Sequence, residues 1–312
     1  MKYLDLSGLK ISNVTLGTVQ LGLDYGINNA SGRPSQEKAG QILSAALEGG
    51  ITAFDTSSAY GTSEKVLGDY FKHCANEKPT IVTKFSIMNH DNPLSKAQAE
   101  RRIIEQVENS LALLNYDSLP LLLVHNEYDL DVYGQTLIST LKRLKNQGVI
   151  KRLGVSLNHF SYIDKVIESQ IFEAVQLPLN MMDVKNSTSG SLTRLEKEGF
   201  FVFVRSVFLQ GLFFRDPDTL PEGILQMAKE PLKKVRKIAE EENVSIAELA
   251  IAYIRGLSGV HSLVLGAENV EQVKQNINLS NVKELSEKAR ERVVEAFKDV
   301  DERVLRPWLW AK

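Results

Sequence analysis

The chain alternates eight times between a short apolar run and a segment with helical character. The apolar runs are 14–16, 51–54, 80–83, 121–124, 150–155, 174–177, 200–204 and 262–265. Regular alternation of strand and helix indicates parallel strands joined by crossover helices. Apolar runs without strict alternation are typical of strands buried on both faces. Eight such units predict an α/β fold, a closed (β/α)8 TIM barrel rather than an open doubly wound sheet.

The segments between the strands set the expected helices and additions. The expected helices are 36–48, one starting near Ser63, 96–114, 133–146, 160–169, 192–198, 245–255 and 270–277. Ser63 is expected to cap the first turn of its helix, and a longer polar insertion follows the seventh run. Residues 3–16, with a turn at Gly8, predict an N-terminal β-hairpin. Residues 284–299 predict an extra C-terminal helix, followed by an aromatic tail at 306–310, and residues 1–312 are expected to form a single barrel domain.

Charge and composition exclude several classes of protein. The formal net charge of −2, with basic and acidic residues interspersed, gives no nucleic-acid or membrane-binding footprint. The most apolar stretch, 200–214, contains Arg205 and Gln210 and is too short to span a bilayer. The single Cys74 rules out an internal disulfide and a cysteine-based metal cluster. The N-terminus has no secretory signal, so a cytoplasmic location is expected. The oligomeric state stays open.

No metal site is expected from the histidines. Four of them show no spacing that is typical of metal ligands. These are His73, His90, His159 and His261.

Four polar residues stand at, or just past, the ends of successive apolar runs. Asp55 and Tyr60 follow 51–54, Lys84 follows 80–83, and His125 follows 121–124. In a barrel of parallel strands, the carboxyl end of the strands is the face that carries chemistry. Taken singly, each residue has an ordinary structural reading, as a cap, a packing residue, a rim charge or a core histidine. Their ordered placement on consecutive strands predicts one site.

The four side chains are predicted to form a proton-transfer site. A free phenol is a poor proton donor at neutral pH, and the ammonium of Lys84 within hydrogen-bond reach of Tyr60 stabilises its phenolate. Asp55 is needed to keep a buried lysine charged. His125 is placed to donate to, or orient, a carbonyl oxygen near the phenol. Together they protonate an oxygen while another group delivers electrons to its carbon.

At these residues the chain resembles the aldo-keto reductases, from Leu16 to Asn276. The segment 54–61, Phe-Asp-Thr-Ser-Ser-Ala-Tyr-Gly, is similar to the family signature around the catalytic aspartate and tyrosine. Segments 82–84 and 123–125 are similar to its lysine and histidine segments. The resemblance implies the barrel fold, a nicotinamide cofactor, and a catalytic tetrad in which Tyr60 is the proton donor.

The resemblance also implies which residues bind the cofactor. Ser156, Asn158 and Gln176 match the segments that hold the nicotinamide carboxamide, although Leu157 stands where the family usually has asparagine. The loop after the seventh strand is expected to wrap the pyrophosphate, and the segment after the eighth to hold the adenosine half. The full set expected to bind the cofactor is Gly17, Thr18, Ser156, Asn158, Gln176, Arg205, Ser206, Leu209, Gly211, Gly266, Gln272, Gln275 and Asn276.

Two departures from the family pattern concern the cofactor. Arg205 stands where the family commonly stacks an aromatic ring on nicotinamide. Its guanidinium plane is able to stack too, or to hold an anionic group of the substrate. Basic residues around the expected 2′-phosphate position are few, with Gly266 and Gln272 at matching places and Lys274 able to serve. The resemblance implies NADP, with NAD as the alternative.

The predicted function is reduction of an aldehyde or ketone to an alcohol with NAD(P)H. A sugar or sugar-derived carbonyl is the expected small-molecule partner, because 20–34 and 205–211 resemble a bacterial subgroup associated with sugar metabolism; a generic aldehyde is the fallback. Two other classes stay open. One is a non-catalytic barrel that binds a dinucleotide for regulation. The other is a lyase or aldolase that forms a Schiff base on Lys84.

Overall fold

A closed barrel of eight parallel strands forms the centre of the molecule. The computed structural model describes residues 1–27, 29, 32–72, 78–87 and 92–310. The strands follow the order β10-β3-β4-β5-β6-β7-β8-β9 around the barrel. They are β3 (Val14–Gly17), β4 (Ala53–Asp55), β5 (Thr80–Phe85), β6 (Leu119–Val124), β7 (Ile150–Ser156), β8 (Ala174–Pro178), β9 (Phe201–Arg205) and β10 (Ser262–Gly266). The predicted (β/α)8 barrel is confirmed.

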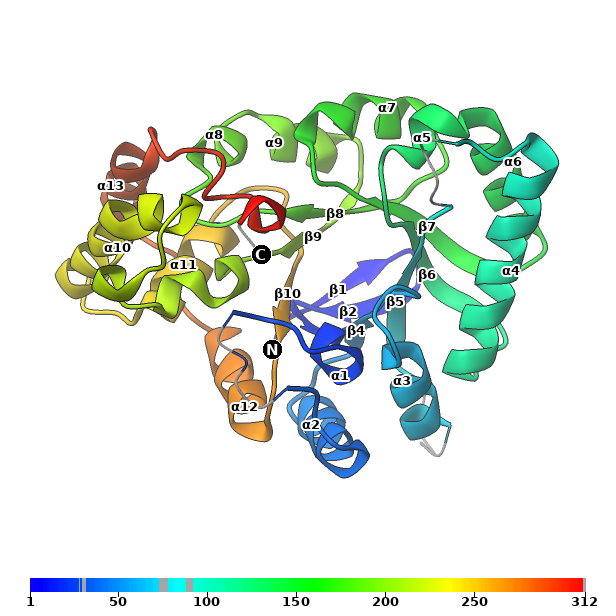
Figure 1. Cartoon of the computed structure of the whole chain (residues 1–312), viewed down its shortest axis with the longest axis horizontal. Helices are drawn as coiled ribbons and strands as arrows, with labels where there is room; N and C mark the ends of the chain where they lie inside the picture. The colour runs from blue at the N-terminus through cyan, green and yellow to red at the C-terminus, as the bar shows by residue number, and fades with distance from the viewer. Residues whose placement is uncertain (28, 30–31, 73–77, 88–91, 311–312) are drawn as a thin grey trace.

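Helices surround the strands (Figure 1). The longer ones are α2 (Gln36–Glu48), α3 (Ser63–Phe71), α4 (Lys96–Leu114), α6 (Gly134–Asn146), α7 (Ile163–Glu168), α9 (Ser191–Lys197), α10 (Lys229–Glu241), α11 (Ile246–Arg255), α12 (Val270–Leu279) and α13 (Glu287–Phe297). Short helical turns lie between them at α1 (Val19–Gly22), α5 (Asp129–Val132) and α8 (Val184–Ser187). The extra C-terminal helix expected at 284–299 is α13.

One helix was missed within the polar insertion. Helix α10 buries Leu232, Val235, Ile238 and Ala239. These positions recur at the three- and four-residue spacing of an amphipathic helix, but charged residues fill the sequence between them. The insertion therefore contributes a packed helix rather than an irregular loop.

The N-terminal hairpin closes the end of the barrel where the strands begin. Strands β1 (Tyr3–Leu6) and β2 (Leu9–Ser12) pair antiparallel, and both turn residues have positive φ, 48° at Ser7 and 93° at Gly8. Positive φ at both central positions defines the type I′ turn that suits a two-residue hairpin. Leu6 and Ile11 pack against inward-facing barrel residues such as Val82, Leu123 and Phe203. The hairpin thus seals the end opposite the strands' carboxyl ends.

Alternation along each strand decides which side chains enter the barrel. On β5, Ile81 and Phe85 belong to the outer core between strands and helices, whereas Val82 belongs to the inner cluster. Side chains two residues apart share a face, so Lys84 points inward above Val82. The same parity takes Asp55 inward from Ala53, and Arg205 inward from Phe203.

The prediction that Ser63 caps α3 is wrong. The residue before the helix is Thr62, which makes no side-chain cap bond. Ser63 lies in the first turn, where its hydroxyl bonds the Thr18 hydroxyl at 2.8 Å and donates to the Thr18 carbonyl at 2.9 Å. It also accepts a bond from the Thr56 hydroxyl at 2.9 Å. Its role is to tie α3 to the segments that follow β3 and β4.

The aromatic tail is partly packed. The ring of Trp310 is buried in the core, and its Nε1 donates to the carbonyl oxygens of Arg303 and Val304 at 3.2 and 3.1 Å. Trp308, in the single turn Pro307–Leu309, is about half exposed. The tail therefore covers apolar surface through one of its two tryptophans.

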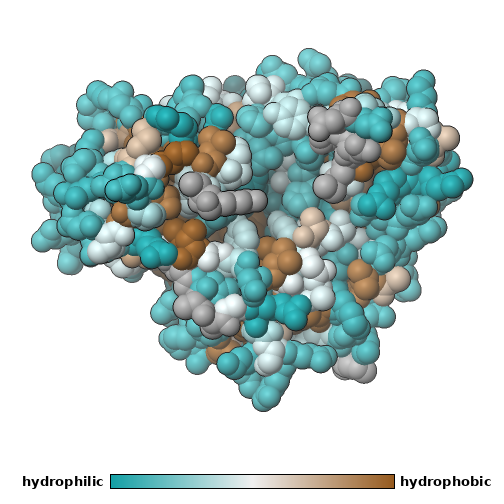
Figure 2. Space-filling model, viewed as in Figure 1, coloured by the Kyte–Doolittle hydropathy of each residue, from teal (hydrophilic) through white to brown (hydrophobic). Residues whose placement is uncertain are grey.

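The outer surface on the side viewed in Figure 2 is mostly hydrophilic, with hydrophobic residues in scattered groups. None of the described helices combines the length and apolar character that crossing a membrane requires. No cluster of three metal-ligating side chains was found within the described ranges. His73, Cys74 and His90 lie outside the described residues.

Candidate active site

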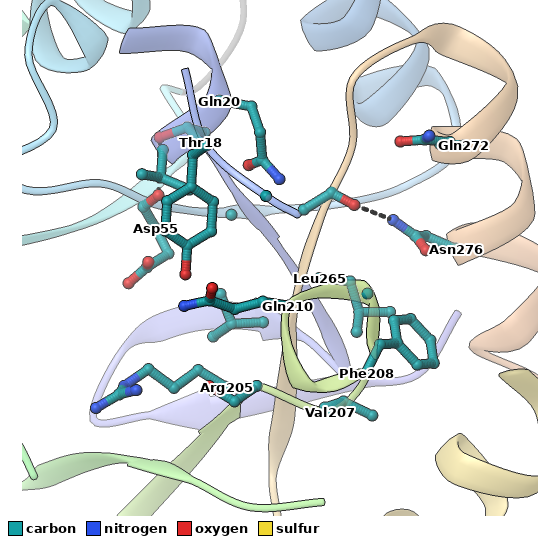
Figure 3. Close-up of a pocket in the computed structure, with 18 of the residues that line it drawn as sticks. Thr18, Gln20, Asp55, Arg205, Val207, Phe208, Gln210, Leu265, Gln272 and Asn276 are labelled. Atoms are coloured by element: carbon teal, nitrogen blue, oxygen red, sulfur yellow. Dashed lines mark hydrogen bonds between the residues drawn. The ribbon is translucent and has the colours of Figure 1, made fainter. Parts of the chain in front are cut away.

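A cavity of about 660 Å³ opens at the carboxyl ends of the strands. Most of the site residues predicted from the sequence line it, as Figure 3 shows for several of them. Those residues are Gly17, Thr18, Asp55, Tyr60, His125, Asn158, Arg205, Ser206, Gly211, Gly266, Gln272, Gln275 and Asn276. Residues distant in the chain therefore meet at one mouth.

Lys84 and Asp55 form a buried ion pair beneath this cavity. The Lys84 ammonium is fully buried and donates to Asp55 Oδ1 at 2.7 Å and to the Thr56 carbonyl at 2.9 Å. Gln176 Nε2 donates to the same Asp55 oxygen at 2.7 Å. A buried ammonium needs a paired carboxylate and further hydrogen bonds to offset its lost hydration. This pair holds a positive charge directly under the cavity.

Tyr60 lies between the ion pair and the cavity. Its hydroxyl is 3.5 Å from Lys84 Nζ, and the same Nζ lies 4.8 Å from the centre of its ring. The ring meets that of His125 edge to face, with centres 5.8 Å apart. The phenol, the ammonium, the carboxylate and the imidazole thus form one cluster.

His125 is electrically neutral over the physiological range. Burial, reinforced by the positive charges of Lys84 and Arg205, lowers the pKa of His125 to about 3. Ser57 Oγ lies 3.0 Å from His125 Nδ1 and 3.4 Å from the Lys84 carbonyl. A neutral imidazole has one N–H and one acceptor nitrogen, so the ring keeps an N–H to donate in either tautomer. The imidazole therefore acts as a neutral N–H donor.

Close backbone contacts fix the position of Tyr60. A Cβ atom at Gly22 would lie 1.8 Å from the Tyr60 carbonyl oxygen, so only glycine allows α1 to approach here. Gly61 has φ of +56°, and a Cβ there would lie 2.4 Å from the Gly22 carbonyl oxygen. The two glycines let α1 and the Tyr60 segment pack backbone to backbone, with Ser63 bonded to Thr18 beside them.

Arg205 reaches across the end of β8 to the segment after β7. Its Nη2 donates to the Leu157 carbonyl at 3.1 Å and to Asn158 Oδ1 at 2.7 Å. Asn158 Nδ2 lies 3.3 Å from Glu127 Oε2. Both ends of the Asn158 amide are therefore engaged within the protein, although the residue lines the cavity.

The loop after β9 has an unusual backbone. Ser206, Leu209 and Gln210 have φ between 49° and 63°, and Gly211 has φ of 92°. Each non-glycine residue in this region costs on the order of 1 kcal/mol. Ser206 and Gly211 line the cavity, whereas Leu209 is buried in the core and does not. Packing of the surrounding structure must compensate the conformational strain of this loop, which turns its backbone toward the cavity.

The segment after β10 forms the opposite wall. Asn276 Nδ2 donates to the Gly266 carbonyl at 3.0 Å (Figure 3). Gln272 Oε1 accepts from the Glu268 amide at 2.8 Å, and Asn269 caps α12. These bonds fix the turn that leads from the strand into the helix.

Four predicted residues do not line the cavity. Lys84 and Gln176 are buried beneath it, in contact with Asp55. Ser156 is buried at the end of β7, opposite Gln176 in the sheet register. Leu209 packs in the core because its backbone turns the side chain inward.

Sequence reasoning missed several lining residues. Gln20 and Tyr25 come from the long loop after β3, and Phe208 and Gln210 lie between residues that were predicted. Loops that follow barrel strands form the rim of such sites, so their position in the chain was a usable signal. Glu268, in the segment after β10, also lines the cavity.

The fold and the site together define a class. A barrel of eight parallel strands with polar side chains gathered at their carboxyl ends is the architecture of many enzymes. The family model "Aldo/keto reductase family" matches residues 13–298, so the chain belongs to the aldo/keto reductase family, a family of oxidoreductases.

Individual relatives and solved structures are similar to this chain over nearly its whole length. The chain is 28% identical over 298 residues to "Uncharacterized oxidoreductase YqkF" of Bacillus subtilis, covering 91% of this chain and 92% of that protein. It superposes with a TM-score of 0.76 on the holo form of aldo-keto reductase AKR11C1 from Bacillus halodurans, at 24% identity, covering 95% of this chain and 96% of that one. The same score relates it to the glycerol dehydrogenase AKR11B4 from Gluconobacter oxydans, at 21% identity, covering 96% and 95%. At these identities the solved structures show the fold alone.

Proposed function

We propose that the protein reduces an aldehyde or ketone to an alcohol with a nicotinamide dinucleotide. One observation carries the proposal: the Tyr60 hydroxyl, facing the cavity, lies 3.5 Å from an ammonium that a buried carboxylate holds at 2.7 Å. That arrangement suits a phenol that gives up and regains a proton.

The residues present fit a dinucleotide. Gln176 Oε1 is buried and has no hydrogen-bond partner among the described residues, and neither has Gln20 Oε1. A ligand amide is able to satisfy such orphaned acceptors, whose burial otherwise costs roughly 1–3 kcal/mol each. We propose that Gln176 and Ser156 hold the nicotinamide end, with Asn158 beside them. The loop 206–211 and the start of α12 would face the phosphates, where backbone N–H groups favour negative charge.

In the proposed reaction, a bound dinucleotide supplies the hydride to the carbonyl carbon. Tyr60 donates its hydroxyl proton to the carbonyl oxygen. Lys84 stabilises the phenolate left behind, and Asp55 keeps that ammonium compensated in its buried position. His125, as a neutral ring, donates a second hydrogen bond to the oxygen as negative charge develops there.

The choice between NADP and NAD rests on family membership, because the cavity wall carries few basic groups. Family membership supports NADP, which we propose, with NAD as the alternative. Lys274 does not line the cavity, and Arg205 is the only lysine or arginine among its described lining residues. Glu268 and Gln272 occupy the wall after β10. Competitive titration of the protein with NADPH and NADH decides between them.

We further propose that residues 1–312 act as a single domain in the cytoplasm. The proposed partner is a small carbonyl compound, a sugar or sugar derivative, with no nucleic-acid or membrane partner.

The test is oxidation of NADPH or NADH on addition of a panel of aldehydes and ketones, followed at the nicotinamide absorbance band. Carbonyl-dependent oxidation is expected. Cofactor binding without oxidation would favour the regulatory barrel. A borohydride-trapped adduct on Lys84 would favour the lyase, but that amine is fully buried and paired, which disfavours nucleophilic attack.

A further inference from the structure

Ser57 contacts the two residues that are proposed to donate to the substrate oxygen. Its hydroxyl oxygen lies 3.0 Å from His125 Nδ1, and its carbonyl oxygen accepts the backbone N–H of Tyr60 at 2.9 Å. Ser57 is 1% exposed and does not line the cavity, whereas His125 and Tyr60 do. It therefore holds both residues from the protein side and leaves the cavity in front of them open to a substrate.

The position of the single ring hydrogen decides what His125 is able to do. Burial and the positive charges of Lys84 and Arg205 lower the pKa of His125 to about 3, so the ring is neutral. Because Ser57 lies at Nδ1, Nε2 is the nitrogen that is left for the cavity. A hydrogen on Nε2 makes His125 a donor to a bound oxygen. A hydrogen on Nδ1 would leave only a lone pair facing that oxygen.

The hydrogen bonds around Ser57 favour one of these two tautomers. Its Oγ already accepts the backbone N–H of Ala59 at 3.1 Å, and its own hydrogen needs an acceptor because the group is buried. The Lys84 carbonyl oxygen is 3.4 Å away, longer than the usual O–H···O bond, and already accepts the backbone N–H of Ser58 at 3.0 Å. Among the described residues, His125 Nδ1 is thus the acceptor at normal distance.

We propose that Ser57 is a positioning residue for the reaction: its hydroxyl donates to His125 Nδ1 and thereby keeps the ring hydrogen on Nε2, directed at the carbonyl oxygen of the substrate. The proposal rests on the proposed function and adds the residue that sets the hydrogen-bonding state of its second donor. The bond from Nε2 strengthens as negative charge develops on the oxygen, so the contribution of Ser57 belongs to kcat rather than to KM.

NMR of protein with isotope-labelled histidine measures the tautomer directly. Correlations between the ring nitrogens and the carbon-bound ring hydrogens distinguish a hydrogen on Nε2 from one on Nδ1. The spectrum of His125→Phe assigns the signals, because those of His125 disappear. In the wild type we expect the hydrogen on Nε2, and in Ser57→Ala a mixture of both tautomers. A hydrogen on Nδ1 in the wild type, or an unchanged tautomer in Ser57→Ala, would overturn the proposal.

Steady-state kinetics of carbonyl reduction measure the consequence. We expect Ser57→Ala to lower kcat about 10-fold, less than the roughly 10²–10³-fold loss typical of removing such a donor outright. The KM for the carbonyl and the Kd for NADPH should change little. Ser58→Ala is the matched control, because Ser58 is the next residue in the chain, is half-buried and does not line the cavity. It should leave both the tautomer and kcat unchanged, and a loss equal to that of Ser57→Ala would contradict the proposal.

A double-mutant cycle shows whether Ser57 acts through His125. In the His125→Phe background, Ser57→Ala should lower kcat no further, because the ring that Ser57 orients is gone. An equal loss in both backgrounds would assign Ser57 a general structural role and overturn the proposal. The NMR measurement needs no turnover. If carbonyls are not reduced at all, the proposed function fails, and the tautomer of His125 in the wild type still decides about Ser57.

Discussion

Replacing Asp55 by asparagine removes the carboxylate from the buried pair and leaves the shape of the side chain almost unchanged. Lys84 keeps its bond to the Thr56 carbonyl at 2.9 Å but loses its counter-ion at 2.7 Å. The gross attraction between unit charges at that distance is about 6 kcal/mol at an effective dielectric constant of ~20. Breaking a buried pair from one side typically costs about 3–5 kcal/mol. Because the bond to the Thr56 carbonyl is retained, the expected loss of stability lies toward the lower end of that range.

Thermal unfolding measures the effect. For a chain of this size, a loss of that magnitude lowers the midpoint by roughly 5–8 °C. The matched control is Asp69→Asn, which breaks the pair between Lys65 and Asp69 at 2.9 Å on the surface of α3. The Lys65 side chain there is 61% exposed. An exposed pair contributes less than about 1 kcal/mol.

Comparing the two variants isolates the effect of burial on stability, because the two ion pairs have almost the same length. A loss for Asp55→Asn no greater than that for Asp69→Asn would refute the reasoning. It would mean that the ammonium beneath the cavity does not depend on its carboxylate, and the account of Lys84 would fail with it.

Other perturbations test separate parts of the account. His125, with a pKa lowered to about 3 against an ordinary 6.5, should keep the NMR signals of a neutral ring down to about pH 4, and titration near pH 6.5 would contradict this. Between about pH 3 and 6.5, only the unfolded chain binds a proton at His125. The free energy of unfolding therefore falls as the pH drops below 6.5. Gly22→Ala should cost about 1–3 kcal/mol and reduce kcat by displacing Tyr60, whereas Gly134→Ala, whose Cβ meets nothing within 4 Å, should be neutral or slightly stabilising; equal effects would argue against the contact. Burial raises the pKa of Glu64, so its contribution to stability is present below pH 4.5 and is lost as the pH rises through the raised value. Glu64→Gln should therefore gain stability relative to wild type as the pH rises above 4.5 in denaturant unfolding, and a constant difference would contradict it.

The strands and the inward-facing site residues were predictable from local pattern. Apolar runs mark the strands, and the two-residue period then places Lys84 inside with Val82 and Arg205 inside with Phe203. This is why four residues at the ends of three consecutive strands, β4, β5 and β6, were expected to lie together. The signal is local, because a strand end in a parallel barrel always faces the same rim.

What escaped prediction depends on contacts between distant segments. The bond from Arg205 to Asn158, and the support of Asn158 by Glu127, join the ends of β9, β7 and β6. No local pattern encodes such pairing. The local capping rule predicted Ser63 as the cap of α3. Ser63 instead lies within the first turn of the helix, where its hydroxyl bonds Thr18, so a tertiary contact overrides the local preference.

The most direct test of the central claim is the turnover of Tyr60→Phe. This variant removes one hydroxyl and leaves the buried ion pair in place. We expect kcat for carbonyl reduction to fall by about 10²–10⁴, the contribution of general acid catalysis, while the Kd for NADPH changes little. Near-normal turnover in Tyr60→Phe would contradict the account, because the proton would then come from elsewhere.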